Sequence, residues 1–327
     1  MHTAWPQIKG TTLLRAGSNL EEEKRALQSA ARILQKGELV AFPTETVYGL
    51  GADALNPGAV RKIFAVKNRP ADNPLIVHVT SLEQAATLVK DMPPAAISLA
   101  RHFWPGPFTL VLPKKAIVPE VITGGLSSVA VRVPAHPLAL KLIRAAGFPL
   151  AAPSANLSGR PSPTTAAHVL EDLAGQIEAV LDGGPCTIGL ESTVLSLLST
   201  PPALLRPGGI GLAELEEICG EKIADLSAHG ENKDDFIGAP RSPGMKYKHY
   251  APRLPLYLVE GTGLEQERQL AALCENLGRK GIKVGAILFA ESWKPGSILH
   301  SSLSAAPSSQ PVVEVLSPRG DSRGAAE

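Results

Sequence analysis

Residues 39–51 of the chain are Leu-Val-Ala-Phe-Pro-Thr-Glu-Thr-Val-Tyr-Gly-Leu-Gly. The four apolar residues that open this stretch stop at Pro43, and they predict a short buried strand. Two threonines and two glycines follow in what we expect to be a loop, where glycine allows the backbone to approach a ligand closely. Taken alone, a tight turn without function accounts for the segment equally well.

Predicted helices lie on both sides of this stretch. The first begins after Ser18, which forms a capping box with Glu21, and the second runs from about Pro57 to Val66 with Asn56 as its N-cap. Further strands and helices alternate along the chain, which predicts an α/β or mixed α+β domain. The expected strands are residues 75–79, 108–112, 129–133, 150–152 and 193–198, and the expected helices include residues 95–103, 138–146 and 165–173.

The pattern changes near residue 227. Residues 227–253 are polar and interrupted by Gly and Pro, so we expect a linker after a first domain at 1–226. Periodicity returns in residues 254–327, which predict a small second α/β domain, Rossmann-like in its β-α-β beginning. Its expected elements are strands at 256–259, 284–289 and 312–316 and a helix at 264–279.

Composition limits the classes of function. The chain has 327 residues with 32 Lys and Arg against 31 Asp and Glu, so any anion site must be local and not a property of the whole surface. The only cysteines, Cys186, Cys219 and Cys274, are far apart, which argues against a disulfide framework or a paired-cysteine zinc site. No leader pattern and no apolar run of roughly 18 residues is present. We therefore expect a cytoplasmic protein that does not enter a membrane.

Cationic residues at two places are candidates for ligand binding. Lys67 and Arg69 are spaced so that both side chains project to one side of an extended segment, which suits a polyphosphate, although a solvated helix end is the simpler interpretation. Arg132 alternates with Val131 and Val133 in a predicted strand. If the valines face a core, Arg132 points to the other face of the sheet, where an inward arginine would need an anion such as a carboxylate.

Small polar residues at three further places could donate hydrogen bonds to phosphate or ribose. Ser154, Asn156 and Ser162 follow a buried strand, in a segment that an ordinary turn would also explain. Ser192 precedes another strand, and Arg206 stands before Pro207 and Gly208. Each of these signals is weak when considered alone.

Together, in their order and spacing, these segments resemble the threonylcarbamoyl-AMP synthase family, whose catalytic domain has the YrdC-like fold, a twisted open sheet with a concave cavity. The resemblance covers about residues 20–220, and the linker segment SPGMKYKHYAP (242–252) is similar to that of longer members with a second domain. The matching segments are FPTETVYGLGADA (42–54), KNRPADNPL (67–75), PGPFTLVL (105–112), VAVRVPAHP (129–137), APSANLSGRPSPT (152–164), GLESTV (189–194) and LLRPGGI (204–210).

The resemblance implies a reaction in which L-threonine and bicarbonate form a carbamate whose carboxylate attacks the α-phosphate of ATP. The products are L-threonylcarbamoyladenylate and pyrophosphate. Mg²⁺ is expected with the triphosphate, and no side chains with metal-ligand spacing are found. A separate tRNA threonylcarbamoyl transferase is the implied partner downstream, with at most a weak contact to tRNA itself.

The resemblance also assigns roles to residues. We expect Lys67→Ala or Arg69→Ala to lower turnover at least tenfold with the fold intact, because these two are taken as the catalytic cations. His78 is expected to be a pocket wall or hydrogen-bond donor. The implied threonine pocket consists of Thr46, His78, Arg132, Ala152 and Ser192. The implied ATP contacts are Lys67, Arg69, Asn73, Ser128, Ser154, Asn156, Ser162 and Arg206.

The linker and the end of the chain give two more expectations. Ser242, Tyr247 and Tyr250 are expected to form a lid over the cavity. The resemblance stops at Asp321, so the second domain is expected to be truncated. Two other functions compete with the synthase: a carbamoyl-transfer protein of hydrogenase maturation, which is longer and has paired-cysteine motifs, and a non-catalytic RNA-binding module of the same fold.

Overall fold

The computed structural model describes residues 5–17, 19–227, 255, 257–261, 263–289 and 312–316. The chain divides into two compact units, Met1–Ala251 and Pro252–Glu327. The expected boundaries of a first domain at 1–226, a linker at 227–253 and a second domain from 254 remain predictions. The lid residues Ser242, Tyr247 and Tyr250 and the expected truncation after Asp321 lie outside the described residues.

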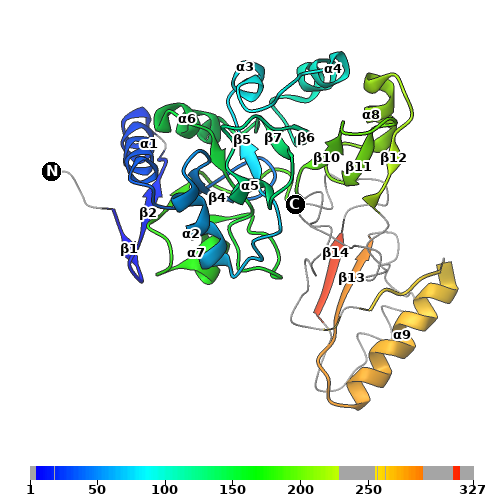
Figure 1. Ribbon diagram of the computed structural model, residues 1–327. Helices are drawn as coiled ribbons and strands as arrows, with labels where there is room; N and C mark the ends of the chain where they lie inside the picture. Colours follow the sequence, from blue (N-terminus) through cyan, green and yellow to red (C-terminus); the bar gives the residue numbers. More distant parts are fainter. Residues whose placement is uncertain are drawn as a thin grey trace. The chain divides into compact units, whose positions relative to one another are not determined.

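The first unit is built on one mixed twelve-stranded sheet (Figure 1). Its order is β1-β2-β9-β3-β4-β8-β5-β7-β6-β10-β11-β12. The strands are β1 (Gln7–Ile8), β2 (Thr11–Arg15), β3 (Val40–Phe42), β4 (Gly49–Asp53), β5 (Ile76–His78), β6 (Phe108–Pro113), β7 (Ser128–Arg132), β8 (Leu150–Ala151), β9 (Ala179–Asp182), β10 (Thr193–Ser196), β11 (Ala203–Arg206) and β12 (Ala224–Asp225). The predicted mixed α/β fold with a large sheet is confirmed.

Eight helices are described in this unit. They are α1 (Leu20–Gln35), α2 (Pro57–Lys67), α3 (Leu82–Ala86), α4 (Pro94–Phe103), α5 (Glu120–Thr123), α6 (Pro137–Ala146), α7 (Ala166–Leu173) and α8 (Leu212–Cys219). The expected cap of the first helix was wrong by one residue, because Asn19 is the N-cap and accepts from the backbone N of Glu22. Ser18 itself lies outside the described residues.

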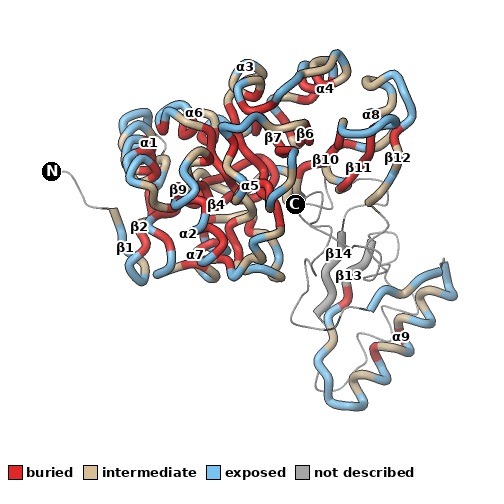
Figure 2. The backbone as a smooth tube through the Cα atoms, viewed as in Figure 1, coloured by how far each residue is buried: buried red, intermediate tan, exposed pale blue. Residues whose placement is uncertain are grey.

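The side chains that alternate along β3 show which helices cover each face of the sheet. Val40 and Phe42 belong to one apolar cluster with α1 and α6, whereas Ala41 belongs to a second cluster with α2, α4 and α7. This is the period of two that a strand imposes on its side chains. Figure 2 shows the buried residues concentrated along the strands and on the inward sides of the helices.

A third apolar cluster lies on strands β5, β6, β7, β10 and β11. It contains Ile76, Val111, Ala130, Val194, Ala203 and Leu205, with Leu226 packed at its edge. No described helix contributes to this cluster, in contrast to the other two. Ile76 of this cluster also lines the open cavity described below.

Six strands of the first unit were not predicted: β1, β2, β4, β9, β11 and β12. Residues 49–53 form β4, paired antiparallel with β3, where a loop was expected. A Cβ on Gly51 would lie 2.8 Å from Cε1 of Phe42, so this glycine allows the Phe42 ring to pack across the neighbouring strand. Strand β9 was not predicted, although it joins the two early strands β2 and β3 by parallel pairing with each.

The second unit contains helix α9 (Gly263–Arg279) and two parallel strands, β13 (Gly285–Phe289) and β14 (Val312–Leu316). The helix and both later strands were predicted from periodicity. The strand expected at 256–259 was wrong, because residues 257–260 have no strand structure, and Leu256 lies outside the described residues. Ala271 and Cys274 of the helix pack with Ala286 of β13.

Candidate functional site

One open cavity brings together polar side chains from distant parts of the first unit. The segments that line it are the β3–β4 connection, the end of α2, strands β5 and β7, the segment after β8, and the residues around β10 and β11. Eight of the predicted site residues line it: Thr46, Arg69, His78, Arg132, Ala152, Ser154, Ser192 and Arg206. Thr44, Gly49 and Glu191 are among the other lining residues. Three guanidinium groups thus share one cavity in a chain with almost no net charge.

Arg132 lines the cavity, is buried, and is held by three groups of the protein. Its Nε donates to the carbonyl of Gly106 at 3.0 Å, and Nη1 donates to Oγ1 of Thr46 at 3.0 Å. Nη2 lies 2.5 Å from Oε1 of Glu45, whose side chain is also buried. The sequence predicted that an inward arginine needs an anion, and the protein supplies one itself, in Glu45. No role was predicted for Glu45, although it lies within the stretch that defines the fold.

His78 lines the same cavity from strand β5, beside Arg132 on β7. Its ring meets the Phe42 ring edge-on, with 6.3 Å between centroids. Its Nδ1 is buried with no hydrogen-bond partner among the described residues. Burial, helped by the positive charge of Arg132, lowers the pKa of His78 to about 3. The imidazole is therefore neutral near pH 7, in keeping with the predicted part in a pocket wall.

The depressed pKa of His78 predicts a loss of stability in acid. An unfolded histidine binds a proton near pH 6.5, while folded His78 stays neutral until about pH 3, so unfolding takes up a proton between these values. His78 should therefore contribute a loss of about 1.4 kcal/mol per pH unit as the pH falls below about 6.5. Urea unfolding at pH 7.5 and pH 5 should show a steeper loss in the wild type than in His78→Asn. Equal losses in the two proteins would contradict the prediction.

Ser192 and Arg206 form a second hydrogen-bonded group in the cavity. The guanidinium of Arg206 donates through Nε to the Ser192 carbonyl at 3.0 Å and through Nη2 to the Ser192 hydroxyl at 3.1 Å. That hydroxyl lies 2.7 Å from the Thr109 hydroxyl. Strands β10 and β11 are antiparallel neighbours, which is why two residues 14 positions apart meet here.

Glu191 contributes a carboxylate to the cavity wall and accepts a hydrogen bond from Ser162 at 2.5 Å. Ser162 was predicted as an ATP contact, and it supports Glu191 from outside the set of lining residues. The backbone after Arg206 packs tightly against this segment. A Cβ on Gly208 would lie 2.4 Å from the carbonyl oxygen of Glu191 and 2.4 Å from the amide nitrogen of Thr193, so only glycine fits there.

Lys67 lies behind the cavity wall and is 1 % exposed. Its ammonium donates to the carbonyls of Ser154 and Asn156 and lies 3.4 Å from Oδ1 of Asn156. Burial, together with the charge of Arg69, lowers the pKa of Lys67 well below its usual range. The lysine thus fixes the segment after β8, which presents Ser154 to the cavity. Its predicted contact with phosphate remains a prediction, as does that of Asn156, which is also buried.

Arg69 reaches the cavity from just beyond α2. The helix ends at Lys67, and its C-cap Asn68 adopts a left-handed conformation with φ of 49°. The amide of Arg69 then donates to the Phe64 carbonyl at 3.0 Å. The Arg69 side chain donates to the carbonyls of Asn73 at 3.2 Å and Pro74 at 3.0 Å. Asn73 is buried, and its Oδ1 has no hydrogen-bond partner among the described residues.

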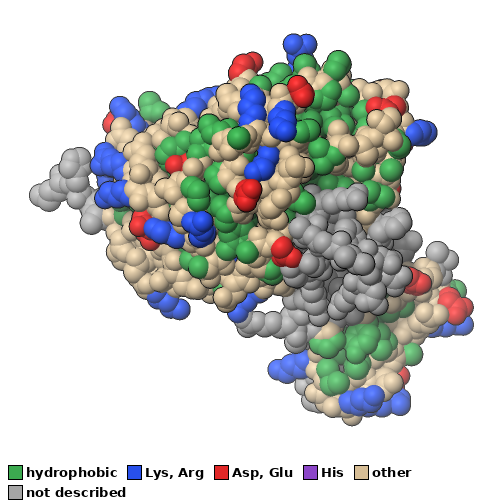
Figure 3. Space-filling model, viewed as in Figure 1, with side chains coloured by type: hydrophobic (Ala, Val, Ile, Leu, Met, Phe, Trp, Pro, Cys, Tyr) green, Lys and Arg blue, Asp and Glu red, His purple; other side chains and the backbone are tan. Residues whose placement is uncertain are grey.

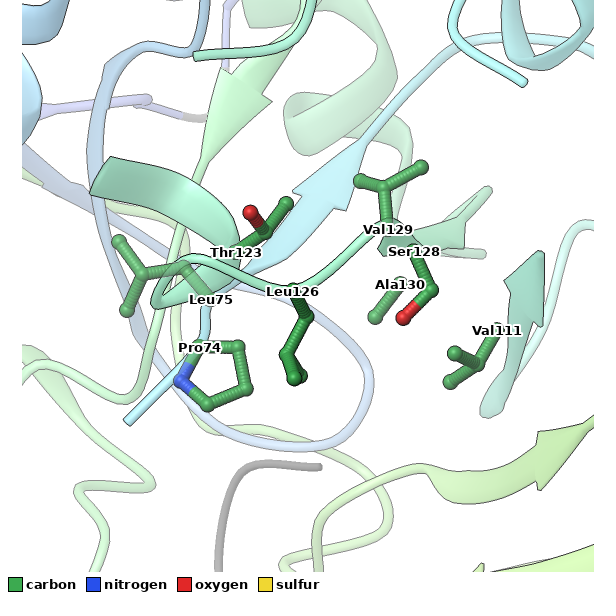
Figure 4. Close-up of a pocket in the computed structure, with 8 residues that line it drawn as sticks. All are labelled: Pro74, Leu75, Val111, Thr123, Leu126, Ser128, Val129 and Ala130. Carbon is green, nitrogen blue, oxygen red and sulfur yellow. The ribbon is translucent and has the colours of Figure 1, made fainter. Parts of the chain in front are cut away.

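Ser128 does not line the main cavity. It lies in a smaller, mostly apolar hollow, shown in Figure 4. Leu75 lines both the hollow and the main cavity, so the two spaces adjoin at this residue. The hollow also contains Pro74, Val111, Thr123, Leu126, Val129 and Ala130. The predicted contact of Ser128 with ATP stays a prediction.

Three further features of the molecule bear on its class of function: metal ligands, membrane-spanning helices and surface charge. Among the described residues, no cluster of three or more His, Cys, Asp or Glu could hold a metal ion. No helix in the described part of the chain has the length and apolarity needed to cross a membrane. On the face shown in Figure 3, basic side chains are scattered among acidic ones and do not form a continuous patch.

The mixed sheet with its arginine-lined cavity is that of a protein of the Sua5/YciO/YrdC class. A model of that family, described as "Telomere recombination", matches residues 32–208, and the chain belongs to this family. A second model, described as "Threonylcarbamoyl-AMP synthase, C-terminal domain", matches residues 210–326.

Within the family, the chain is similar to proteins named threonylcarbamoyl-AMP synthase. The Pyrococcus abyssi protein is 51% identical over 277 residues, covering 85% of this chain and 80% of the relative. The Bacillus subtilis protein is 49% identical over 263 residues, covering 80% and 73%. The crystal structure of P. abyssi Sua5 complexed with L-threonine superposes with a TM-score of 0.82 at 42% identity, covering 97% of this chain and 95% of that one.

Proposed function

We propose that this protein is a threonylcarbamoyl-AMP synthase, which converts L-threonine, bicarbonate and ATP into L-threonylcarbamoyladenylate and pyrophosphate. The observation that carries the proposal is the cavity, where buried Arg132 and the less buried Arg69 and Arg206 converge. Such a site suits a substrate carboxylate beside a polyphosphate. The relatives named for this activity, one of them in complex with L-threonine, support the assignment.

The cavity divides into two proposed parts. In the first, Arg132 binds the threonine carboxylate, while Thr46, His78, Ser192 and the backbone at Ala152 surround the amino acid. In the second, Arg69, Ser154 and Arg206 contact the phosphates of ATP. Lys67 and Asn156 support this second part from behind, and Asn73, Ser128 and Ser162 are proposed to lie along the rest of the nucleotide.

The chemistry needs no nucleophile from the protein. The carbamate formed from threonine and bicarbonate supplies the attacking oxygen. A new bond forms between that oxygen and the α-phosphorus of ATP, and the bond from this phosphorus to the β-phosphate oxygen breaks to release pyrophosphate. Arg69 and Arg206 would hold the phosphates in line and stabilise the negative charge that develops on them.

We propose that Mg²⁺ binds together with the triphosphate of ATP. It commonly uses one or two carboxylates together with substrate phosphates, and among the described residues Glu191 is the one carboxylate that lines the cavity. That single carboxylate fits a metal held mainly by phosphate oxygens. When bound, the metal would supply further neutralisation of phosphate charge.

The product is a mixed anhydride, so an acceptor must consume it before water does. We propose that a tRNA threonylcarbamoyl transferase takes it up in the cytoplasm and that this protein makes at most a weak contact with tRNA. The three cysteines, none of them in a disulfide, are compatible with a reducing compartment. The RNA-binding module is the weaker alternative, because the cavity combines phosphate-type and carboxylate-type sites.

Pyrophosphate release tests the proposed function directly. Purified protein with ATP and Mg²⁺ should release pyrophosphate only when both threonine and bicarbonate are present. Mass spectrometry of the mixture should detect threonylcarbamoyl-AMP. Absence of turnover, combined with salt-sensitive RNA binding, would instead support the RNA-binding module.

Replacing Arg69 by alanine should lower turnover at least tenfold without loss of the fold. The residue is only partly buried and lies on a loop, while a charge-assisted hydrogen bond to phosphate is worth about 1.5–3 kcal/mol. Arg61→Ala is the matched control, because Arg61 is an exposed arginine on the neighbouring helix α2. Steady-state pyrophosphate release and thermal melting should be measured for both variants. Wild-type turnover in Arg69→Ala would remove its proposed role.

A further inference from the structure

Glu45 is a buried carboxylate for which the proposed reaction has no direct use. It is 6% exposed, and both of its carboxylate oxygens have partners. Oε1 lies 2.5 Å from Nη2 of Arg132, and Oε2 accepts from the amide nitrogen of Ala135 at 3.0 Å. The residue therefore connects the guanidinium to the backbone just beyond strand β7, which carries Arg132.

The contacts of Arg132 leave a particular pair of donors unused. A guanidinium has five N–H groups: one on Nε and two on each terminal nitrogen. Among the described residues, Gly106 uses the one on Nε, Thr46 uses one on Nη1 and Glu45 uses one on Nη2. One N–H then remains on each terminal nitrogen, and each can donate to an oxygen of a ligand carboxylate.

The backbone of Glu45 anchors a second wall of the cavity. Its carbonyl accepts from the amide of Ile188 at 2.8 Å, and the next carbonyl, that of Thr46, accepts from Gly189 at 3.0 Å. The chain from Gly189 continues directly into Glu191 and Ser192, which line the cavity. Glu45 thus joins Arg132 and the approach to Ser192 in a single hydrogen-bonded unit.

We propose that Glu45 is a positioning residue that holds Arg132 in the orientation needed to bind the threonine carboxylate before threonine arrives. A buried arginine without a counter-charge is costly, and in the empty cavity its side chain would turn toward water. Glu45 removes that tendency and fixes the guanidinium plane, so the two remaining N–H groups keep one orientation. Its effect belongs to the threonine part of the cavity and not to the nucleotide part. This inference rests on the proposed function.

The test measures threonine and ATP binding separately by titration calorimetry. Glu45→Gln keeps the size of the side chain but removes its charge, and it should raise the threonine Kd at least tenfold while the ATP Kd changes less than twofold. Glu45→Asp keeps the charge but is one methylene too short to reach both Arg132 and Ala135. It should show an intermediate loss of threonine affinity. Glu38→Gln, which breaks the more exposed pair with Lys62, is the matched control and should leave both affinities unchanged.

The outcomes separate this inference from the proposed function. If the wild type binds no threonine, the proposed function fails. If it binds threonine and folded Glu45→Gln binds it equally well or better, the positioning role fails. A parallel loss of threonine and ATP affinity would mean that Glu45 has only a structural role and would also overturn the inference. If Glu45→Gln does not fold, the positioning role of Glu45 is tested by Glu45→Asp. An unaltered threonine Kd in that variant would refute the role.

Discussion

Replacing Lys67 by methionine is expected to destabilise the protein by about 3 kcal/mol or more and to lower turnover at least tenfold. The sequence predicted an intact fold after removal of this lysine, and the structure changes that expectation. Lys67 is almost completely buried, and its ammonium satisfies the carbonyls of Ser154 and Asn156. Methionine fills similar space but donates no hydrogen bond, so these acceptors would stay buried without a partner.

Turnover should fall together with stability, because the lysine fixes the segment that presents Ser154 to the cavity. Denaturant unfolding and pyrophosphate release would be measured on the same preparation. Lys62→Met is a matched control on the exposed side of the same helix, where the lysine is 44% exposed, and should change stability by less than about 0.5 kcal/mol. Equal stability of the two variants would show that the hydrogen bonds of Lys67 do not support the fold.

Replacing Arg132 by glutamine is expected to abolish threonine-dependent turnover, with a fall of at least about a hundredfold, since two charge-assisted hydrogen bonds to the substrate are lost. Stability should also fall, by about 3–5 kcal/mol, because the carboxylate of Glu45 would remain buried without its partner.

The double variant Glu45→Gln/Arg132→Gln separates these two effects. Making both side chains neutral removes the isolated buried charge, so most of the lost stability should return. Turnover should stay low because no guanidinium is present for threonine. Recovery of turnover along with stability would show that Arg132 supports the fold and does not bind the substrate.

Much of the fold could be predicted from local patterns in the sequence. Helix α6 (Pro137–Ala146) and strand β7 (Ser128–Arg132) lie within one or two residues of their expected positions, because apolar periodicity reports which face is buried. Strand β4 escaped prediction, since two of its five residues are glycines with no side chain to show alternation. Strand β9 is four residues long and is defined mainly by its neighbours in the sheet.

The site was predictable as a set of residues but not as a set of contacts. The ion pair between Glu45 and Arg132 joins positions 87 residues apart, and no local pattern reports such a meeting. The burial of Lys67 did have a signal: it follows Val60, Ile63 and Phe64 at helical spacing and continues their buried stripe. Because its side chain is charged, Lys67 was instead expected to contact phosphate.

The place of β9 between β2 and β3 sets an order of events during synthesis on the ribosome. Val40 pairs with Ala179, so roughly 140 residues must be added before β3 gains this neighbour. At about 5–20 residues per second, the early part of the chain waits on the order of ten seconds with unpaired strand edges. A nascent chain stopped before residue 179 would leave Thr12 and Val40 without their partners in β9. Helix α1 (Leu20–Gln35), with its own N-cap at Asn19, can form during this interval.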